Sequence, residues 1–388
     1  MTRESAPSKV ILRQKPTLRQ VAEVAGVCPS TVSAVLNRSP RARAYSDETK
    51  EKILAAAREL GYVPNPLARS LKKNRTNLLG VVLFCQHSTY FVSMLQGVEE
   101  QSHALGFEII TADMRRDANR LERCLHLVTA WRVEGVLLMI GSHPVNRSLL
   151  SSVRDAGTPC VEIGSPNSDY PASYVSFDNF RAGQLIAEHL VSLGHAEIGV
   201  LAGSPENLDS ERRLAGIRSV LGKRGIDLVD RRVIKASDNR FELSAGYHAA
   251  GRLLEEHPEV TAIVSINDAM AIGAIRRIRE SGRDVPGDVS VAGFDDLCLD
   301  DITDHDNRLG AYINPSLTTI RAPLHDVGKA AASVLAEMVN GGESEERKRI
   351  EFAPELVVRE STGPVKVADR RKTLATKAAS TTGEGKGR

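Results

Sequence analysis

Apolar residues recur at helical spacing in two short segments near the start of the chain, 18–25 and 29–36. Gly26 follows the first segment, where a left-handed C-cap is expected, and Pro29 suits the first turn of the second. The positions that would face inward are Leu18, Val21, Ala22, Ala25, Val32, Val35 and Leu36. The other face of the second helix carries Ser30, Thr31, Ser33, Ala34 and Asn37. A helix with small polar side chains fits a DNA major groove about 12 Å wide, although an ordinary helical hairpin has the same spacing.

Two more helices are predicted directly after this pair. One spans 47–60 and is closed by Gly61. Its inner face consists of Ile53, Leu54, Ala57 and Leu60. The other is short and spans 65–73, where Asn65 is a good N-cap and Pro66 occupies the first turn. Because a helix this short is not stable alone in water, we expect it to fold only against a partner.

From residue 77 onward, strand-like runs alternate with helical stretches, which is typical of an α/β body built on parallel sheets. The predicted strands are 78–84, 107–112, 134–139, 159–164, 197–203, 231–236, 261–266 and 289–295. Several helical stretches end in glycine, namely Gly106, Gly157, Gly194, Gly225 and Gly282. A helix over 324–339 and a last strand over 350–361 complete the pattern. We expect these strands and helices to form two α/β halves with a cleft between them. Ligands would bind in that cleft, at the carboxyl ends of the strands.

The ordered segments resemble the lactose-repressor (LacI/GalR) family of bacterial transcriptional regulators. The resemblance rests on TLRQVAEVAGV, STVSAVLN, ETKEKILAAARELGYVPNPLARSLK and the strand LLGVV, and it covers about residues 17–363. It implies an all-α helix-turn-helix DNA-binding domain joined by a hinge helix to an α/β, periplasmic-binding-protein-like body of two subdomains. It also implies a homodimer whose reading heads bind a pseudo-palindromic operator, and whose hinge helices push a leucine into the minor groove. By position that leucine is Leu71, with Ala68 packed beside it, and such a wedge kinks the duplex.

The expected domains follow from these segments. A flexible arm covers 1–16, the DNA-binding domain 17–64, and the hinge helix and linker 65–76. The effector-binding and dimerisation domain covers 77–363. Its first half is expected at about 77–177 and 317–345, and its second half at about 178–316 and 346–363. The remaining residues, 364–388, form a polar basic tail that we expect to be disordered.

The reading helix and its surroundings supply the expected DNA contacts. They are Thr17, Leu18, Pro29, Ser30, Thr31, Ser33, Ala34, Asn37, Arg38, Arg41, Arg43, Asn65, Ala68, Leu71 and Lys72. The three arginines follow the reading helix and would bind phosphates, or else lie on a solvated loop. Many relatives have an arginine where this chain has Ala34, so its operator should differ at the base that this arginine would read.

The expected effector site is built from loops that follow the strands. Its candidates are Tyr90, Phe91, Asn207, Asp209, Arg213, Phe241, Asn267, Asp268 and Asp295. The resemblance places Arg213 where the family grips the ligand and Phe241 where an aromatic ring covers it. Asp268 can alternatively cap the next helix, and Tyr90 and Phe91 can alternatively belong to the core or to a dimer contact. The mixture of carboxylate, amide and aromatic groups favours a small polar effector such as a sugar.

The charge is divided unevenly along the chain. Residues 1–76 hold 15 Lys and Arg against 6 Asp and Glu, a net charge of +9. Residues 77–363 hold 29 against 41, which gives −12, and the tail holds 7 against 2, which gives +5. The whole chain is therefore near neutral at +2, but it carries a basic head on an acidic body. Such a head suits double-stranded DNA and predicts binding that weakens steeply with salt.

Other functional classes fit less well. An exported solute-binding protein would explain the body but not residues 17–73, and it would need a signal segment that the N-terminus does not offer. No GxSxG, Walker A loop or metal-type His/Cys spacing occurs, so we expect neither an enzyme nor a cofactor. The five scattered cysteines and the lack of an 18-residue apolar run favour a cytoplasmic protein that does not contact membranes. An acidic insertion after Asp295 is expected to be a solvated loop, with a cation site as the alternative.

Overall fold

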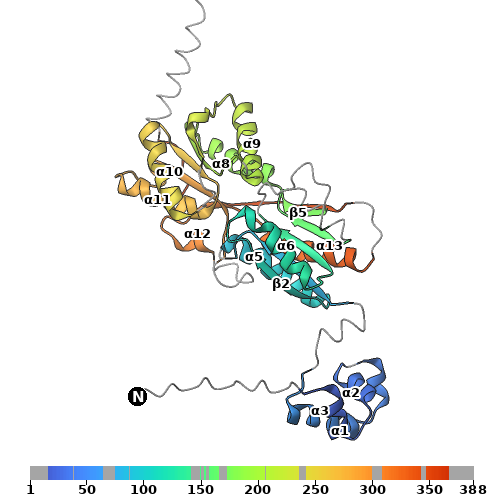
Figure 1. Ribbon diagram of the computed structural model, residues 1–388. Coiled ribbons are helices and arrows are strands. Elements are labelled where there is room, and N and C mark those ends of the chain that lie inside the picture. Colours follow the sequence, from blue (N-terminus) through green and yellow to red (C-terminus); the bar gives the residue numbers. More distant parts are fainter. Residues whose placement is uncertain are drawn as a thin grey trace, which may run out of the picture. The chain divides into compact units, whose positions relative to one another are not determined.

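The computed structural model describes residues 16–37, 39–63, 75–86, 88–140, 149, 153, 157–165, 173–205, 207–235, 242–298, 308–341 and 347–366. The chain forms two compact units, Met1–Thr76 and Asn77–Arg388, called here the N-terminal unit and the C-terminal unit (Figure 1). The division falls where the effector-binding domain was predicted to begin. Several predicted sites lie outside the described residues: the hinge helix with Asn65, Ala68, Leu71 and Lys72, the phosphate contact Arg38, the effector residue Phe241, the acidic insertion and most of the tail.

The N-terminal unit consists of short helices whose ends are set by the sequence. They are α1 (Leu18–Ala25), α2 (Pro29–Leu36), the 3-10 helix η1 (Pro40–Ala44) and α3 (Asp47–Leu60). Thr17 and Gln20 form a capping box at the start of α1, and Gly26 closes that helix with a φ of 65°. Gly61 closes α3 in the same left-handed conformation. These bounds confirm the three helices that the sequence predicted.

The core of the N-terminal unit lies where the three helices meet. Its buried residues are Val21, Ala22, Val32, Val35, Ile53, Ala56 and Ala57. One predicted core position is wrong, because Leu54 is 44% exposed and Ala56 is buried instead. The buried face of α3 is therefore displaced from the predicted one, and it consists of Ile53, Ala56, Ala57 and the partly buried Leu60.

The C-terminal unit contains two six-stranded sheets. The first sheet is entirely parallel, in the order β11-β5-β4-β3-β1-β2. Its strands are β1 (Leu78–Leu83), β2 (Glu108–Asp113), β3 (Gly135–Met139), β4 (Cys160–Ile163), β5 (Ser173–Phe177) and β11 (Arg349–Phe352). The second sheet has the order β12-β10-β9-β8-β6-β7, with only the β10–β12 pair antiparallel. Its strands are β6 (Ile198–Ala202), β7 (Val233–Lys235), β8 (Ala262–Ser265), β9 (Ser290–Asp295), β10 (Thr318–Arg321) and β12 (Glu355–Val357).

Helices cover the faces of both sheets (Figure 1). They are α5 (Thr89–Ala104), α6 (Leu121–Ala130), α8 (Asn179–Ser192), α9 (Leu208–Lys223), α10 (Leu243–Glu256), α11 (Asp268–Glu280), α12 (Leu309–Tyr312) and α13 (Leu324–Val339), with the 3-10 turns η2 (Ala118–Arg120) and η3 (Asp230–Arg232). The five predicted helix-ending glycines all have positive φ, from 63° at Gly225 to 92° at Gly194. None of the helices in the described part of the chain is long and apolar enough to span a membrane. The five cysteines, all in that part, form no disulfide, and Cys28 alone among them is exposed.

All eight predicted strands are present, within two residues of their expected ends. Two strands, β5 and β10, were not predicted, because runs of only five and four residues give little periodic signal. The predicted last strand is two strands, β11 and β12, separated by Pro354, which cannot donate a ladder hydrogen bond.

The boundaries between the two halves also need correction. The chain crosses between the sheets three times, as the expected bounds of the two halves imply: at residue 178, at 322–323 and at 353–354. However, β10 lies in the second sheet, although residues from 317 onward were assigned to the first half. Conversely, β11 lies in the first sheet, although residues from 346 onward were assigned to the second. The helix α13 does pack on the first half, against α5 and strands β3 to β5.

Candidate functional site

A pocket lies between the two sheets, where the carboxyl ends of their parallel strands face each other. Its lining comes from both halves and consists of Phe84, Cys85, Ser88, Tyr90, Phe91, Arg116, Asn207, Asp209, Ser210, Arg213, Ile266, Asn267 and Asp295. Seven of these were predicted from the sequence: Tyr90, Phe91, Asn207, Asp209, Arg213, Asn267 and Asp295. This is the place where ligands bind in parallel α/β folds.

The Arg213 side chain organises the floor of the pocket. Its Nε donates to Asn179 Oδ1 at 2.8 Å, and its Nη1 donates to the carbonyl oxygen of Ile266 at 2.5 Å. Its Nη2 lies 3.4 Å from Asp295 Oδ1. The guanidinium also stacks between the rings of Phe177 and Phe294, with its carbon 5.5 and 4.8 Å from their centroids. The Arg213 side chain is therefore buried, at 5% exposure, and most of its N–H groups are directed to other residues of the protein.

Close helix packing fixes the position of that arginine. The helices α8 and α9 touch at Gly183 and Gly216, where an added Cβ would lie 2.0 Å from the Arg213 carbonyl and 2.1 Å from the Phe180 carbonyl. No side chain larger than hydrogen fits at either position. Asn179 begins α8 and Arg213 lies in α9, so this contact sets the distance between the two partners.

Asp209 is the second buried carboxylate of the floor. Its Oδ1 accepts hydrogen bonds from Asn179 Nδ2 at 2.9 Å and from the backbone N–H of Ser165 at 3.2 Å. Ser165 follows β4 in the first sheet, so this contact joins the two halves. Glu162, in β4, is 3% exposed, and burial together with the Asp209 charge raises its pKa to about 7.

The two asparagines of the pocket are helix caps. Asn207 Oδ1 accepts from the backbone N–H of Ser210 at 2.9 Å and begins α9. Asn267 Oδ1 accepts from the backbone N–H of Met270, also at 2.9 Å, and begins α11. Both residues therefore fix a helix end at the pocket as well as line it.

Asp268 does not belong to the pocket, which corrects that prediction. It is fully buried, and its carboxylate accepts from Thr319 Oγ1 at 2.6 Å and from the backbone N–H of Leu297 at 3.1 Å. Nor does it cap α11, because Asn267 does so. Burial and the nearby charge of Asp295 raise the pKa of Asp268 well above its ordinary value. The sequence placed it in the site because it follows the predicted strand 261–266, as Asn267 does.

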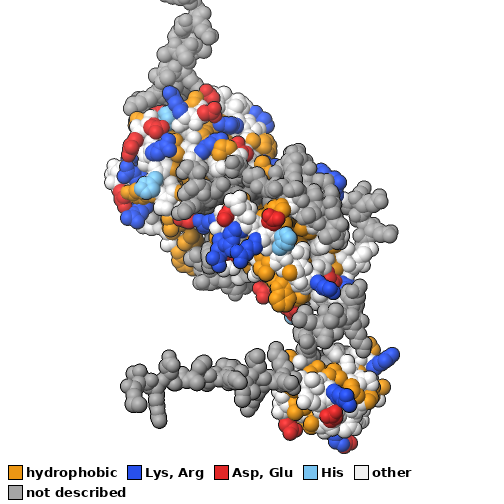
Figure 2. All heavy atoms as spheres, viewed as in Figure 1, with side chains coloured by type: hydrophobic (Ala, Val, Ile, Leu, Met, Phe, Trp, Pro, Cys, Tyr) orange, Lys and Arg blue, Asp and Glu red, His pale blue; other side chains and the backbone are white. Residues whose placement is uncertain are grey.

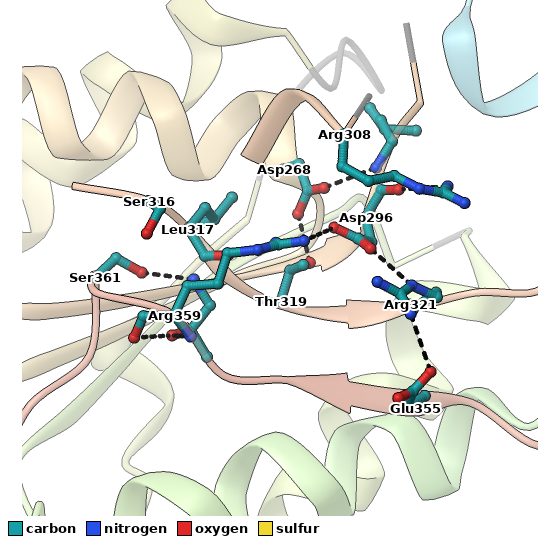
Figure 3. Close-up of polar contacts among 12 residues, drawn as sticks. Asp268, Asp296, Arg308, Ser316, Leu317, Thr319, Arg321, Glu355, Arg359 and Ser361 are labelled. Atoms are coloured by element: carbon teal, nitrogen blue, oxygen red, sulfur yellow. Dashed lines mark hydrogen bonds and ion pairs between the residues drawn. The ribbon is translucent and has the colours of Figure 1, made fainter. Parts of the chain in front are cut away.

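The end of β9 and the residue after it are held in an unusual conformation. Asp295 has a φ of 105° and Asp296 a φ of 49°, both in the region that favours glycine. Asp295 faces the pocket, and its pKa is raised to about 6 by burial, an effect that Arg213 opposes. Asp296 turns away and is fully buried between Arg321 Nε at 2.8 Å and Arg359 Nη2 at 2.7 Å (Figure 3). Two arginines thus hold the strained turn that presents Asp295.

Tyr90 and Phe91 form the aromatic wall of the pocket. Their rings meet edge to face, with centroids 5.4 Å apart. Phe91 is also buried in the core of the C-terminal unit. Its side chain therefore both lines the pocket and belongs to the core, the two alternatives that the sequence left open. Residues that sequence reasoning missed include Cys85, Ser88 and Arg116. For Arg116 a signal existed, since two consecutive arginines closely follow a predicted strand.

The reading helix of the N-terminal unit exposes fewer residues than predicted. Pro29 and Ser30 are exposed, and Ser33 and Asn37 are partly so. Thr31 and Ala34 are buried, at 7% and 8% exposure, because α2 packs against both η1 and α3. This contradicts their placement on the outward face.

Residues around the reading helix complete this surface. Arg41 and Arg43 are exposed on η1, and Thr17 is exposed at the start of α1, whereas Leu18 packs against the core. Cys28 is exposed just before α2, with its Sγ 3.0 Å from both Ser30 Oγ and Thr31 Oγ1. These hydrogen bonds lower the pKa of the Cys28 thiol to about 7.

Comparison with known proteins identifies both units. The model of bacterial regulatory proteins of the lacI family matches residues 17–65, and that of the periplasmic binding protein-like domain matches residues 187–362. The transcriptional repressor PurR of Mannheimia succiniciproducens is 33% identical over 346 residues, 89% of this chain and 98% of PurR. The regulator DegA of Bacillus subtilis is 30% identical over 353 residues, 90% of this chain and 99% of DegA.

Solved structures agree with these relatives. The lac repressor dimer bound to operator and the anti-inducer ONPF matches with a TM-score of 0.77 and 28% identity, over 90% of this chain and 100% of that one. The CelR–cellobiose complex matches with a TM-score of 0.64 and 29% identity, over 89% and 99%. Fold and pocket together thus define a DNA-binding transcriptional regulator with an effector-binding body. The chain belongs to the LacI/GalR family, which confirms the resemblance and the fold class predicted from the sequence.

Proposed function

We propose that this regulator is a homodimer that binds a pseudo-palindromic operator and represses transcription, with its affinity set by a small molecule in the pocket. The observation that carries the proposal is the composition of the pocket, to which both halves contribute. A ligand that touches Tyr90 in one half and Asp295 in the other changes the free energy of bringing the halves together. The basic N-terminal unit supplies the DNA-binding surface.

On the DNA side, base edges are read by the residues that α2 exposes: Pro29, Ser30, Ser33 and Asn37. Thr17, Arg41 and Arg43 bind phosphates and fix the orientation of the helix in the groove. Residues 65–73 fold as hinge helices on the operator, and Leu71 enters the minor groove with Ala68 beside it. Thr31 and Ala34 stabilise the reading helix from within rather than contact bases.

The coupling between pocket and operator is an equilibrium between two arrangements of the halves. Effector binding changes the angle between them and so the spacing of the two hinge helices in the dimer. Hinges that are spread apart cannot fold together in the minor groove, and the affinity for DNA then falls. A coupling of about 1–3 kcal/mol changes that affinity by about 5–150-fold.

The pocket favours a polar, ring-shaped ligand. Tyr90 and Phe91 offer an aromatic wall, and Asp209, Asn267 and Asp295 offer hydrogen-bonding groups. The CelR structure, a complex with cellobiose, gives independent support for a sugar or a related metabolite. Enzymatic turnover is not expected, since the relatives named above are regulators.

The test is selection of bound duplexes from a random DNA library by the full-length protein. We expect a pseudo-palindrome with a constant central step, which is the footprint of a dimer with inserted hinges. An enriched single half-site would contradict the dimer. The selected operator then serves in a screen of sugars and related metabolites, where a shift in operator affinity identifies the effector. A repeat of the selection with these compounds pooled covers the case in which the effector is needed for DNA binding.

A further inference from the structure

One ion pair joins the two halves at the edge of the pocket farthest from the crossings. Arg116 follows β2, the edge strand of the first sheet, and Glu242 precedes α10, which follows the edge strand β7 of the second. The crossings leave from β5, β10 and β11, toward the opposite edges of the two sheets. Rotation about the crossings therefore separates the Arg116 and Glu242 edges more than any other part of the pocket.

The contacts of Arg116 place it both across the cleft and in the pocket. Its Nη1 lies 2.5 Å from Glu242 Oε1, with the two side chains 36% and 47% exposed. Its Nε donates to Cys85 Sγ at 3.4 Å, so the guanidinium lies over a buried pocket thiol. The backbone N–H of Arg116 donates to the Phe84 carbonyl at 2.8 Å, which anchors the residue beside the end of β1.

The two arginines of the pocket differ in what they can offer a ligand. Arg213 is buried and committed to Asn179, Ile266 and Asp295. Within the part of the chain that the structure describes, Arg116 has one carboxylate partner, Glu242, and that partner is itself half exposed. Exposed ion pairs of this kind contribute little to stability, so a ligand can replace Glu242 at little cost. Lys and Arg side chains also gather near α5 and α6 on the face seen in Figure 2, which favours the approach of an anion.

We propose that Arg116 is the charge-selecting residue of the effector site: it binds a carboxylate or phosphate group of the effector, and Glu242 holds it across the cleft until that group displaces it. This inference rests on the proposed function, because it concerns the same pocket. It narrows the effector to a small polar metabolite that carries one anionic group. It also makes effector binding and the release of the cross-cleft ion pair a single event.

Cys85 allows a test that needs neither the effector nor DNA. In full-length protein with Cys28→Ser, the rates at which iodoacetate and iodoacetamide alkylate Cys85 are followed by peptide mass spectrometry. The two reagents are similar in size and differ in charge, and their rate ratio is normalised to that of the unfolded chain. Arg116→Gln should lower the ratio by about threefold, and Glu242→Gln should raise it by about as much, because the arginine then lacks its counter-charge.

Arg115→Gln is the matched control, because it removes an adjacent exposed arginine that does not line the pocket. A ratio that responds to Arg115→Gln as much as to Arg116→Gln would overturn the proposal. So would a ratio unchanged in Glu242→Gln, or a Cys85 that neither reagent reaches in any variant. Acetate and inorganic phosphate are then tested separately, at equal ionic strength, for protection of Cys85 against alkylation. Protection that is seen in the parent and lost in Arg116→Gln supports the proposal. The anion that protects shows whether the site prefers a carboxylate or a phosphate. Failure of any of these leaves the operator selection unaffected.

Discussion

The Nε atom of Arg321 donates a hydrogen bond to Asp296 Oδ2 at 2.8 Å, and this bond ties the end of β10 to the loop behind the pocket. Arg321 also reaches Glu355 at 3.2 Å, on the strand that follows the third crossing (Figure 3). Asp295, the neighbour of Asp296, faces the ligand space. One continuous set of contacts therefore connects the pocket with two of the three segments about which the halves move.

The first prediction concerns Asp296. Asp296→Ala should lower the free energy of unfolding by about 3 kcal/mol, because it leaves Arg321 and Arg359 without a carboxylate they share in the interior. Urea titration measures the change. Glu355→Ala is the control, since that carboxylate is 67% exposed and its loss should cost under about 1 kcal/mol. Equal effects of the two substitutions would contradict the role assigned to Asp296.

The second prediction separates the two neighbouring arginines of α9. Arg213→Ala should reduce the effector response of the operator complex by more than about tenfold, because Asp295 loses its buried partner and the pocket floor its shape. Arg212→Ala removes a partly exposed pair with Glu351 and no pocket contact, so it should change the response far less than Arg213→Ala does. Operator dissociation at increasing effector concentration is the measurement. An unaltered response in Arg213→Ala would remove that residue from the site.

The third prediction concerns pH. The pKa of Glu162 is raised to about 7 in the folded protein from an ordinary 4.5, so the folded state binds the proton more tightly than the unfolded chain. The protonated Glu162 side chain therefore stabilises the folded state. Its contribution to the free energy of unfolding, up to about 3 kcal/mol, is fully present below about pH 4.5 and is lost as the pH rises through 7. Urea titrations at pH 5 and pH 8 should show Glu162→Gln to be less pH-sensitive than the parent. An identical pH dependence in the two proteins would refute the assignment.

The fourth prediction concerns the thiol at the start of the reading helix. Because the pKa of Cys28 is lowered to about 7 from an ordinary 9.0, its alkylation rate should rise with a midpoint near pH 7. Ser30→Ala removes the hydrogen bond that contributes most and should move the midpoint upward. Ser33→Ala, which changes a serine of the same helix without contact to the thiol, should leave it in place. Stopped-flow measurement of thiol reaction from pH 6 to 9 decides between these outcomes.

The fifth prediction tests the hinge. Leu71→Ala should weaken binding to the selected operator far more than binding to random DNA, because an apolar wedge acts only when the hinge helices are folded in the minor groove. Fluorescence anisotropy with both duplexes gives the ratio of the two affinities. A proportional loss on both would mean that Leu71 contributes no wedge.

Local signals account for most of what could be predicted from the sequence. The helices and strands could be predicted from glycines that follow helices, caps that precede them and runs of apolar residues. Most of the pocket residues could be predicted because they directly follow strands. What could not be predicted depends on long-range packing. Asn179 enters the site through a helix contact with α9, and Asp296 is buried by arginines 25 and 63 positions away in the chain. Thr31 and Ala34 were predicted to be exposed because the contact between η1 and α2 produces no periodic pattern of apolar residues in the sequence.

The order in which the chain visits its two sheets has a consequence for its synthesis. The first sheet lacks its edge strand until Phe352 has been made, and the second lacks its own until Val357. Both halves are thus completed within a few residues of each other, more than 270 residues after the N-terminal unit ends at Thr76. A chain that stops early, or that is cut before this point, would retain a DNA-binding head without a finished sensor. The effector-sensing body is therefore complete only once its last two strands have been made.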